Sequence, residues 1–512
     1  MLMLCGQSAP PAAADGSGTL GLFENQSDVG MVMPAGGGSY DPVARRYIIA
    51  AAGANTWYHL DDFHFLWKKM SGDVALTADI SFPPHSYDHD PNPHRKAILM
   101  FRQTLDGGGI YADVAAHGSG MVALQYRRER GANSQDIELN IDAPRTVRLE
   151  KRGDIFTLYL SMAGEPLHQA GASIVLHLKQ PFYVGLGAVS HDVTTIDKVV
   201  FSKVTLQPLA PVSRTATFAL YSALQTIQID DQFRRAMVIR TVSGSIESAS
   251  WAPDGKSIYA YEDGHVEKIP YLEPAAGGKP ELVDTGELID CGGNYGLSFD
   301  GKFLAMTCAD TQGGPHQVYV MPVHGAGPPR KLTQGATSSY FHAWSPDSQT
   351  LAFTRGSAGK ADLFTVPAGG GEERRLTGDT LNDAPDYSPD GQFIYFDSSR
   401  SGTTQIWRMQ ADGSAAEQLT DDDNLNSSPH LSRDGKTLAF LSQPVGSGAG
   451  IGAAAIRVMA LSDGLIRTVV DFQGYRNSFS TYGWGDANHL AFVSYQSLPG
   501  GNHVNPPGEV AR

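Results

Sequence analysis

The sequence predicts an all-β protein in which a two-sheet antiparallel sandwich is followed by a six-bladed β-propeller. Three observations lead to this fold class. A turn motif recurs at intervals of 43 to 53 residues in the C-terminal part, the N-terminal part alternates apolar and polar residues, and 57 glycines and 30 prolines provide many turns. A period of roughly 40 to 50 residues is typical of propellers, and strict alternation is typical of half-buried strands.

The sandwich comes first, at residues 19–206. Alternating runs such as 74–82, 122–127 and 155–160 are separated by turn residues, which favours two packed antiparallel sheets. This part resembles the DUF1349-type, concanavalin-like sandwich in seven segments: 63–69, 72–74, 94–97, 100–102, 111–113, 150–154 and 183–187. A short Pro-rich linker, which we expect to be semi-rigid, follows at residues 207–220.

The propeller is predicted over residues 221–512, and its repeat is clearest at 382–391, N-D-A-P-D-Y-S-P-D-G. Proline presets φ and glycine accepts a positive φ, so the Pro-Asp-Gly end forms a tight turn. Three further β-rich runs follow each turn, which gives the four strands of a blade. One aromatic residue or leucine precedes the turn in every repeat: Trp251, Leu297, Trp344, Tyr387, Leu431 and Trp484.

The sixth repeat is incomplete, because only a Gly/Pro/Asn-rich tail follows Val493. Residues 224–229 and 235–239, which precede the first repeat, can supply the two missing strands. Such closure joins the two ends of the propeller in one blade and removes exposed sheet edges. The repeats over about 221–495 resemble the TolB-type propeller, a relative of WD40. This resemblance implies the fold, whereas propellers host many unrelated activities.

The N-terminal end and the composition indicate the compartment of the protein and the class of its partners. Residues 1–18 predict a disordered end or an incomplete secretory signal, with a lipoprotein anchored at Cys5 as an alternative. We therefore expect a periplasmic or secreted protein. No apolar stretch is long enough to span a membrane. A net charge of −15 without a basic run argues against nucleic acid as a partner.

Two of the three cysteines belong to neighbouring strands of one repeat. Cys291 lies at the start of one strand and Cys308 at the end of the next, and the turn at 299–302 folds these strands together. The register places the two residues nearly opposite each other, which predicts a cross-strand disulfide and an oxidising compartment. Two buried free thiols are the alternative.

Candidate ligand-binding residues gather where the chain runs into the innermost strands of the propeller. In this fold these segments converge around the central channel, and here they are rich in Asn, His, Asp and Tyr, which suit a polyhydroxylated ligand. Asn and Asp are also common there because they tolerate turn geometry. The candidates at this mouth are Glu247, Asn294, Tyr340, His342, Asn382, Asp383, Asn426, His430 and Arg476.

If the mouth is catalytic, His342 and His430 are the expected acid and base, since His titrates near neutral pH. Asp383 would orient one of them or bind a cation, for which Ca²⁺ or Mn²⁺ is considered. This arrangement resembles that of propeller-fold polysaccharide lyases, which use His, Tyr and Arg. The resemblance implies that Tyr340 and Arg476 of this chain contact an acidic sugar. The resemblance leads us to expect an Asn-Asp-His-Gly-like run at 293–296, where the chain reads Gly-Asn-Tyr-Gly. The missing His argues against a metal and against an inherited activity.

The sandwich offers a second candidate surface. Arg102, His117 and Gln125 lie on alternating strands and are expected to share one face, as in a lectin-like sheet that binds glycans. An ordinary solvated sheet face is the alternative.

Two functions follow from these patterns. The first is an extracytoplasmic carbohydrate-recognising protein, which could cleave oligo- or polysaccharides as a lyase or glycoside hydrolase through His/Asp chemistry at the mouth. The second is a non-enzymatic, TolB-like scaffold that binds envelope proteins through the same mouth.

Overall fold

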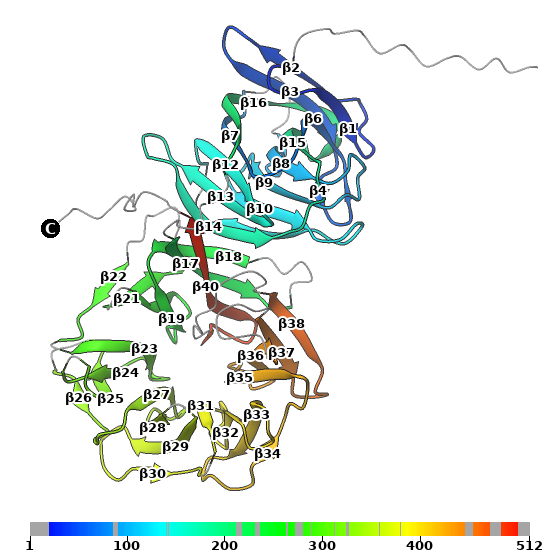
Figure 1. Ribbon diagram of the computed structural model, residues 1–512. Coiled ribbons are helices and arrows are strands. Elements are labelled where there is room, and N and C mark those ends of the chain that lie inside the picture. Colours follow the sequence, from blue (N-terminus) through cyan, green and yellow to red (C-terminus); the bar gives the residue numbers. More distant parts are fainter. Residues whose placement is uncertain are drawn as a thin grey trace, which may run out of the picture.

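The computed structural model describes residues 20–499 except 85–90, 140, 142, 211–217, 231–235, 263–264, 272–279, 287, 312, 324–326, 358, 379, 446–453 and 472–482. Within these residues every regular element is a strand. No helix that could cross a membrane occurs in them. The chain forms two bodies, an N-terminal sandwich and a C-terminal ring of blades (Figure 1). The expected end segment 1–18 lies outside the described residues.

The sandwich consists of two facing sheets. One sheet has seven strands in the order β14-β13-β12-β7-β16-β3-β2. Their bounds are β2 Gly37–Asp41, β3 Arg46–Gly53, β7 Val74–Ser81, β12 Thr146–Arg152, β13 Ile155–Ser161, β14 His168–Val175 and β16 Asp192–Pro208. Because β16 runs to Pro208, the first residues of the predicted linker continue the sandwich. The linker residues 211–217 lie outside the described part.

The second sheet of the sandwich contains β1-β6-β15-β8-β9-β10-β11. These strands are β1 Asn25–Val29, β6 Phe63–Met70, β8 Lys96–Arg102, β9 Tyr111–His117, β10 Val122–Arg127, β11 Gln135–Leu139 and β15 Phe182–Val189. Alternate residues such as Leu99, Val114 and Leu124 pack with Leu76 and Leu149 of the facing sheet in one buried core. This is the inward and outward alternation that the sequence predicts.

A small hairpin lies against the other face of this sheet. It consists of β4 Thr56–Trp57 and β5 Leu60–Asp61. Side chains of the hairpin bond to the sheet beneath: Asp61 accepts hydrogen bonds from Arg127, and Lys96 donates to the hydroxyl of Thr56 at 3.4 Å. The face that would be solvated in a simple sandwich is therefore covered.

Five separate four-stranded sheets form the regular blades of the propeller. In chain order they are β19 Ile246–Trp251, β20 Ser257–Glu262, β21 His265–Pro270, β22 Glu281–Val283; β23 Ile289–Leu297, β24 Phe303–Ala309, β25 His316–Pro322, β26 Arg330–Lys331; β27 Ser339–Trp344, β28 Thr350–Ser357, β29 Lys360–Pro367, β30 Arg374–Arg375; β31 Asn382–Tyr387, β32 Phe393–Ser398, β33 Gln405–Gln410, β34 Glu417–Gln418; and β35 Asn424–Leu431, β36 Thr437–Pro444, β37 Ala455–Ala460, β38 Ile466–Asp471.

The structure has five separate blades and not the predicted six, although the strands predicted to close the sixth blade do pair with each other. β17 Phe218–Gln228 and β18 Ala236–Ser243 do pair with β40 His489–Pro499 and β39 Gly483–Trp484, in the order β18-β17-β40-β39. This set is not independent, because β11 of the sandwich pairs in parallel with β18, from Ile137 with Ala236 to Leu139 with Val238. One 11-stranded sheet therefore runs through both domains. The sequence could not show this, because parallel partners lie far apart in the chain.

The repeated turn is a hydrogen-bonded unit. In the fourth blade the Ser388 hydroxyl donates to Asp390 at 2.6 Å and accepts from the backbone N–H of Phe393 at 2.9 Å. The same pair of bonds recurs around Ser298, Ser345 and Ser432. The serine of the motif thus ties the innermost strand to the next strand in the second to fifth blades.

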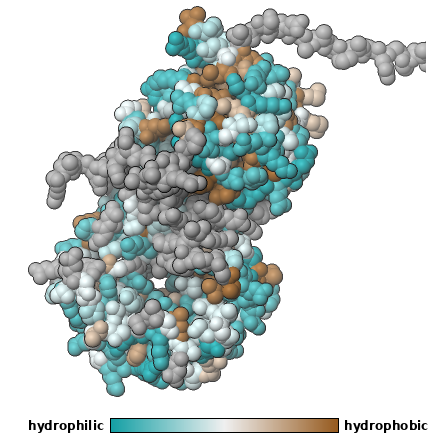
Figure 2. Space-filling view, in the orientation of Figure 1, coloured by the Kyte–Doolittle hydropathy of each residue, from teal (hydrophilic) through white to brown (hydrophobic). Residues whose placement is uncertain are grey.

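The visible surface of both domains is largely hydrophilic, with scattered hydrophobic residues (Figure 2). Such a distribution is ordinary for a folded protein in water. Exposed apolar side chains include Met31, Val43, Leu282 and Leu465.

Candidate functional site

The innermost strand of every regular blade carries a β-bulge. The register shifts between Phe341 and Ala343 in β27, between Asp383 and Asp386 in β31, and between Ser427 and His430 in β35. β19 shifts between Ile246 and Ser248, and β23 shifts on both sides of Cys291. A bulge inserts an unpaired residue and redirects the side chains around it. The bulges therefore decide which residues of the repeat reach the central channel.

The channel is a cavity of about 200 Å³ at the centre of the ring. All six aligned aromatic or leucine positions of the repeat line it. Two of the indoles also join neighbouring blades: Trp344 donates to the carbonyl of Gly296 at 3.0 Å, and Trp484 donates to that of His430 at 3.0 Å. The repetition of the motif thus produces a ring of large side chains around the channel.

A guanidinium sits at the end of the channel near the Pro-Asp-Gly turns. Arg433 lines the cavity and donates to the carbonyls of Pro253 at 3.1 Å and Ala252 at 3.4 Å. These bonds connect the fifth blade to the first, past the short strand β39. Burial lowers the pKa of Arg433, against the attraction of Asp486 and Asp254.

Two histidines and two carboxylates lie further along the channel, and the carboxylates come from the same strand. Asp383 Oδ1 of β31 lies 3.2 Å from His342 Nε2 of the third blade. Asp386 Oδ2, on the far side of the bulge, lies 3.5 Å from His430 Nδ1 of the fifth blade. The fourth blade therefore supplies a carboxylate to the imidazole of each neighbour.

A second carboxyl group lies behind Asp383. Asp397 is the cross-strand partner of Asp383, is almost completely buried, and accepts the backbone N–H of Ser428 at 2.9 Å. Burial and the nearby charge of Asp383 raise the pKa of Asp397 to about 7. Burial alone would also raise the pKa of Asp383, but the hydrogen bond to His342 and its charge lower it to about 2. One carboxyl group is thus ionised at neutral pH while its neighbour is partly protonated.

The structure brings together several of the predicted mouth residues. His342, His430 and Asn294 line the channel, and Asp383 pairs with His342. Tyr340 is 36% exposed and stacks on His316, with ring centroids 5.9 Å apart. Glu247 is exposed at the bulge of β19. Arg476 lies outside the described residues.

Asn382 and Asn426 are not available to a ligand, which corrects the prediction for both. Each is completely buried. Asn382 accepts hydrogen bonds from Ser398 and Arg400, both at 2.8 Å. Asn426 donates to Gln405 at 2.9 Å. Both polar atoms of the Asn382 amide are bonded, as is usual for a buried amide, whereas the buried carbonyl oxygen of Asn426 has no hydrogen-bond partner among the described residues.

The predicted face on the sandwich is also not an open binding surface. Arg102 is completely buried and donates to the backbone carbonyls of Thr104 and Asp106. Gln125 accepts a hydrogen bond from Lys96 at 3.1 Å beneath the β4–β5 hairpin. His117 is 6% exposed, and burial lowers its pKa to about 2, so it stays neutral. Period-2 alternation placed these residues on one face correctly but could not show the hairpin that covers it.

Sequence reasoning missed three residues, two that line the channel and one buried behind Asp383. Asp386 belongs to the repeat motif itself, and its place beside a bulge explains why a simple count of strand positions missed it. Asp397 ends a strand that otherwise reads as apolar, and this lone acidic residue was the available signal. Arg433 replaces the proline of the turn motif, which was visible as a departure from the repeat.

Cys291 and Cys308 form a disulfide bond between β23 and β24. For the cation, the described residues contain no group of three or more His, Cys, Asp or Glu side chains placed to hold a metal ion.

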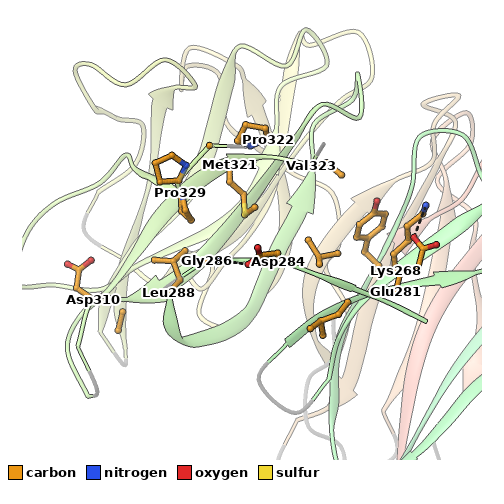
Figure 3. Close-up of a pocket in the computed structure, with 16 residues that line it drawn as sticks. Lys268, Glu281, Asp284, Gly286, Leu288, Asp310, Met321, Pro322, Val323 and Pro329 are labelled. Carbon is orange, nitrogen blue, oxygen red and sulfur yellow. Dashed lines mark hydrogen bonds and ion pairs between the residues drawn. The ribbon is translucent and has the colours of Figure 1, made fainter. Parts of the chain in front are cut away.

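Another cavity, of about 730 Å³, lies away from the channel, between outer strands of the first and second blades (Figure 3). Its charged groups are largely paired with each other or with neighbours. Lys268 lies 3.5 Å from Glu281, and Asp310 pairs with Lys331. Apolar residues such as Leu288 and Met321 form much of its wall.

A ring of four-stranded blades around a central channel, with one motif per blade, defines a β-propeller. The TolB β-propeller family model matches residues 333–471. A solved structure from Agrobacterium tumefaciens, provisionally assigned as TolB, is 31% identical with a TM-score of 0.50, and covers 55% of this chain and 100% of that one. The chain therefore belongs to the TolB-like β-propeller family.

Two further relatives complete the comparison. The uncharacterized protein Atu1656 of Agrobacterium fabrum is 34% identical over 120 residues, which are 23% of this chain and 39% of the relative. The chain thus matches well under half of that relative's length. TolB from Acinetobacter baumannii is 15% identical with a TM-score of 0.41, over 63% of this chain and 78% of that one.

Proposed function

We propose that the protein is an extracytoplasmic binding protein whose propeller mouth receives a segment of another polypeptide. One observation carries this proposal: the channel is small, and two histidine–carboxylate pairs face it. Small-molecule sites usually enclose roughly 300–1,000 Å³, whereas this channel offers about 200 Å³. That volume suits a side chain or a chain end inserted from a larger partner.

The charges at the mouth indicate which chemical group of the partner would be inserted. Asp383 is ionised at neutral pH, and its side chain is 48% exposed. Asp386 lies beside it on the same strand, and Glu247 stands exposed at the bulge of β19 in the first blade. A cationic group, such as a lysine or arginine side chain, complements this set. The net charge of −15 would also attract a basic partner over a longer distance.

Other features support a location outside the cytoplasm and an envelope protein as partner. The Cys291–Cys308 disulfide is typical of oxidising compartments. Membership in the TolB-like family is consistent with a scaffold role. The DUF1349-type identity of the sandwich and the domain limits 19–206 and 221–512 remain our predictions.

The test is a peptide-display library of unstructured 12-residue segments, selected on the purified full chain. We expect enrichment of sequences with one or two basic residues, and loss of that enrichment on Asp383→Asn. Glu281→Gln, an exposed carboxylate on the outer strand of the first blade, is the matched control and should select the same peptides as wild type. Equal selection by Asp383→Asn would remove the mouth from the interaction.

A second function, cleavage of a carbohydrate, is favoured by one observation. Asp383 and Asp397 are adjacent carboxyl groups whose pKa values are driven apart, to about 2 and about 7, and such pairs often divide acid and base roles. Here His342 would exchange the proton with the substrate, and Asp383 would orient the imidazole. Asp397 is too buried to contact a substrate and would act through Asp383.

A panel of neutral and acidic oligosaccharides distinguishes the two functions. Product release that disappears in His342→Ala and His430→Ala would establish catalysis, and an unsaturated product end would identify a lyase. The polypeptide-binding proposal predicts no product with any member of the panel.

A further inference from the structure

One buried position of the repeat carries a carboxyl group in the fourth blade and not in the other four regular blades. Asp397 is the fifth residue of β32, and the fifth residues of β24 and β28 are Thr307 and Thr354. In β20 and β36 the same position is occupied by Tyr261 and Leu441. All five side chains are buried. Because a buried carboxyl group is costly unless it is paired or protonated, its presence here calls for a reason that the fold alone does not give.

The hydrogen bond that Asp397 makes does not require a carboxyl group. Its Oδ2 accepts the backbone N–H of Ser428 in the fifth blade at 2.9 Å. In the second blade, Thr307 Oγ1 accepts the N–H of Phe341 of the third blade, also at 2.9 Å. Phe341 and Ser428 both stand three residues before the aligned aromatic or leucine position, so the two bonds are equivalent. A hydroxyl group is therefore sufficient to hold the bulged strand of the next blade.

Asp397 connects the two histidine–carboxylate pairs of the mouth. Its cross-strand partner is Asp383, which pairs with His342. The bulge of β35 that it holds also carries His430. Within this bulge Ser428 has a φ of 53°, a left-handed conformation that costs free energy for a residue with a side chain. The bond to Asp397 therefore helps to hold the segment that positions His430.

Charged and titratable groups surround Asp397 on several sides. The elements packed against β32, and the segments next to them, contribute Asp383 and Asp386 of β31, His342 of β27, Arg408 of β33, His430 of β35 and Arg400 after β32. Burial and, next to it, the charge of Asp383 raise the pKa of Asp397 to about 7. How firmly Asp397 holds its proton therefore depends on how far the charge of Asp383 is neutralised.

We propose that Asp397 is a proton-binding site linked to the mouth, which loses its proton when a cationic group of the partner binds at Asp383. This inference rests on the function proposed for the mouth. The positive charge offsets the field of Asp383, the O–H bond of Asp397 breaks, and the proton leaves to solvent. The carboxylate that remains is a stronger acceptor for the N–H of Ser428. Because binding releases a proton, the affinity for the partner rises with pH.

The test compares the dissociation constant of a basic peptide, selected by display on the full chain, at about pH 5.5 and pH 8. Wild type should gain about three- to tenfold more affinity over this range than Asp397→Asn, the factor expected when a bound charge lowers a neighbouring pKa by about 0.5 to 1. Asp397→Thr installs the residue that the second and third blades carry here, and it serves if Asp397→Asn fails to fold. Groups that titrate in all three proteins cancel in this comparison.

Calorimetry of the same peptide at pH 7, in buffers of different ionisation enthalpy, counts the released protons directly. Wild type should release more protons than either variant. Asp79→Asn removes a buried carboxylate of the sandwich and is the matched control, which should behave like wild type. Equal pH dependence and equal proton release in wild type, Asp397→Asn and Asp397→Thr would overturn the inference alone. A wild type that binds no basic peptide at either pH would overturn the proposed function, and the inference with it.

Discussion

At the scale of single residues, the mouth is organised by the bulge of β31. The bulge lets Asp383 and Asp386 face different neighbours, and each carboxylate meets an imidazole from an adjacent blade. Burial and, next to it, the charge of Asp383 raise the pKa of Asp397, so that Asp397 holds its proton to a higher pH. A cluster of this kind is sensitive to pH in a direction that follows from the two pKa values.

Asp397 should make the protein less stable as the pH rises from about 4 to about 7. Its pKa of about 7 lies above the unfolded value near 4, so the folded state binds the proton more tightly and loses this advantage on ionisation. Asp397→Asn keeps an acceptor for the N–H of Ser428 and removes the ionisation. Unfolding by urea should show that the variant gains roughly 2–4 kcal/mol relative to wild type between pH 5 and pH 8. Parallel pH profiles for the two proteins would show that Asp397 does not titrate in this range.

Sequence reasoning selected His342, His430 and Asp383 because the motif repeats and these residues stand near its turn, and the structure places each imidazole beside a carboxylate. It failed for Asn382 and Asn426, since a strand position alone does not tell whether an amide faces the channel or a neighbouring strand. The bulges decide that orientation, and the sequence does not mark them clearly.

At the scale of elements, the repeated turn explains why the blades were recognisable. Each Ser-x-Asp turn closes two side-chain hydrogen bonds, so the motif is retained where the geometry is needed. The first blade departs from it, with Ala252 at the serine position and Asp254 still accepting from the N–H of Lys256. The turn of the first blade, which lacks the serine, can therefore be compared with the turns of the other four blades.

Ser388→Ala should destabilise the protein by about 1–2 kcal/mol, because the N–H of Phe393 loses its side-chain acceptor. Ala252→Ser should have the opposite sign and add about 0.5–1 kcal/mol, since the new hydroxyl can reach Asp254 and the N–H of Ser257 in the same geometry. Denaturant unfolding at one pH measures both changes. A loss of stability in Ala252→Ser would mean that the first turn differs from the others in more than its side chain.

At the scale of the whole molecule, the 11-stranded sheet makes the two domains one structural unit. Sequence patterns predicted both domains and the pairing of β17 with β40, because each depends on local alternation and on the repeat. They could not predict the parallel pairing of β11 with β18, which depends on how two finished domains meet.

This shared sheet predicts one cooperative unfolding transition for the full chain in scanning calorimetry. Glu138→Pro removes a backbone donor from β11 next to Met237 of β18 and should split the transition into two. Ser39→Pro is the control, because Ser39 lies on the edge strand β2, away from the pairing of β11 with β18. It should lower the stability of the sandwich but leave that pairing, and therefore the single transition, intact. Two transitions already present in wild type would show that the domains unfold independently.

The central claim is that the propeller mouth binds a cationic polypeptide segment through Asp383. The most direct measurement is the dissociation constant of one selected basic peptide, determined by fluorescence anisotropy with wild type, Asp383→Asn and Glu281→Gln. We predict that binding weakens by at least about tenfold in Asp383→Asn, as expected for a charge-assisted hydrogen bond, and stays unchanged in Glu281→Gln. Equal affinity for all three proteins would contradict the account.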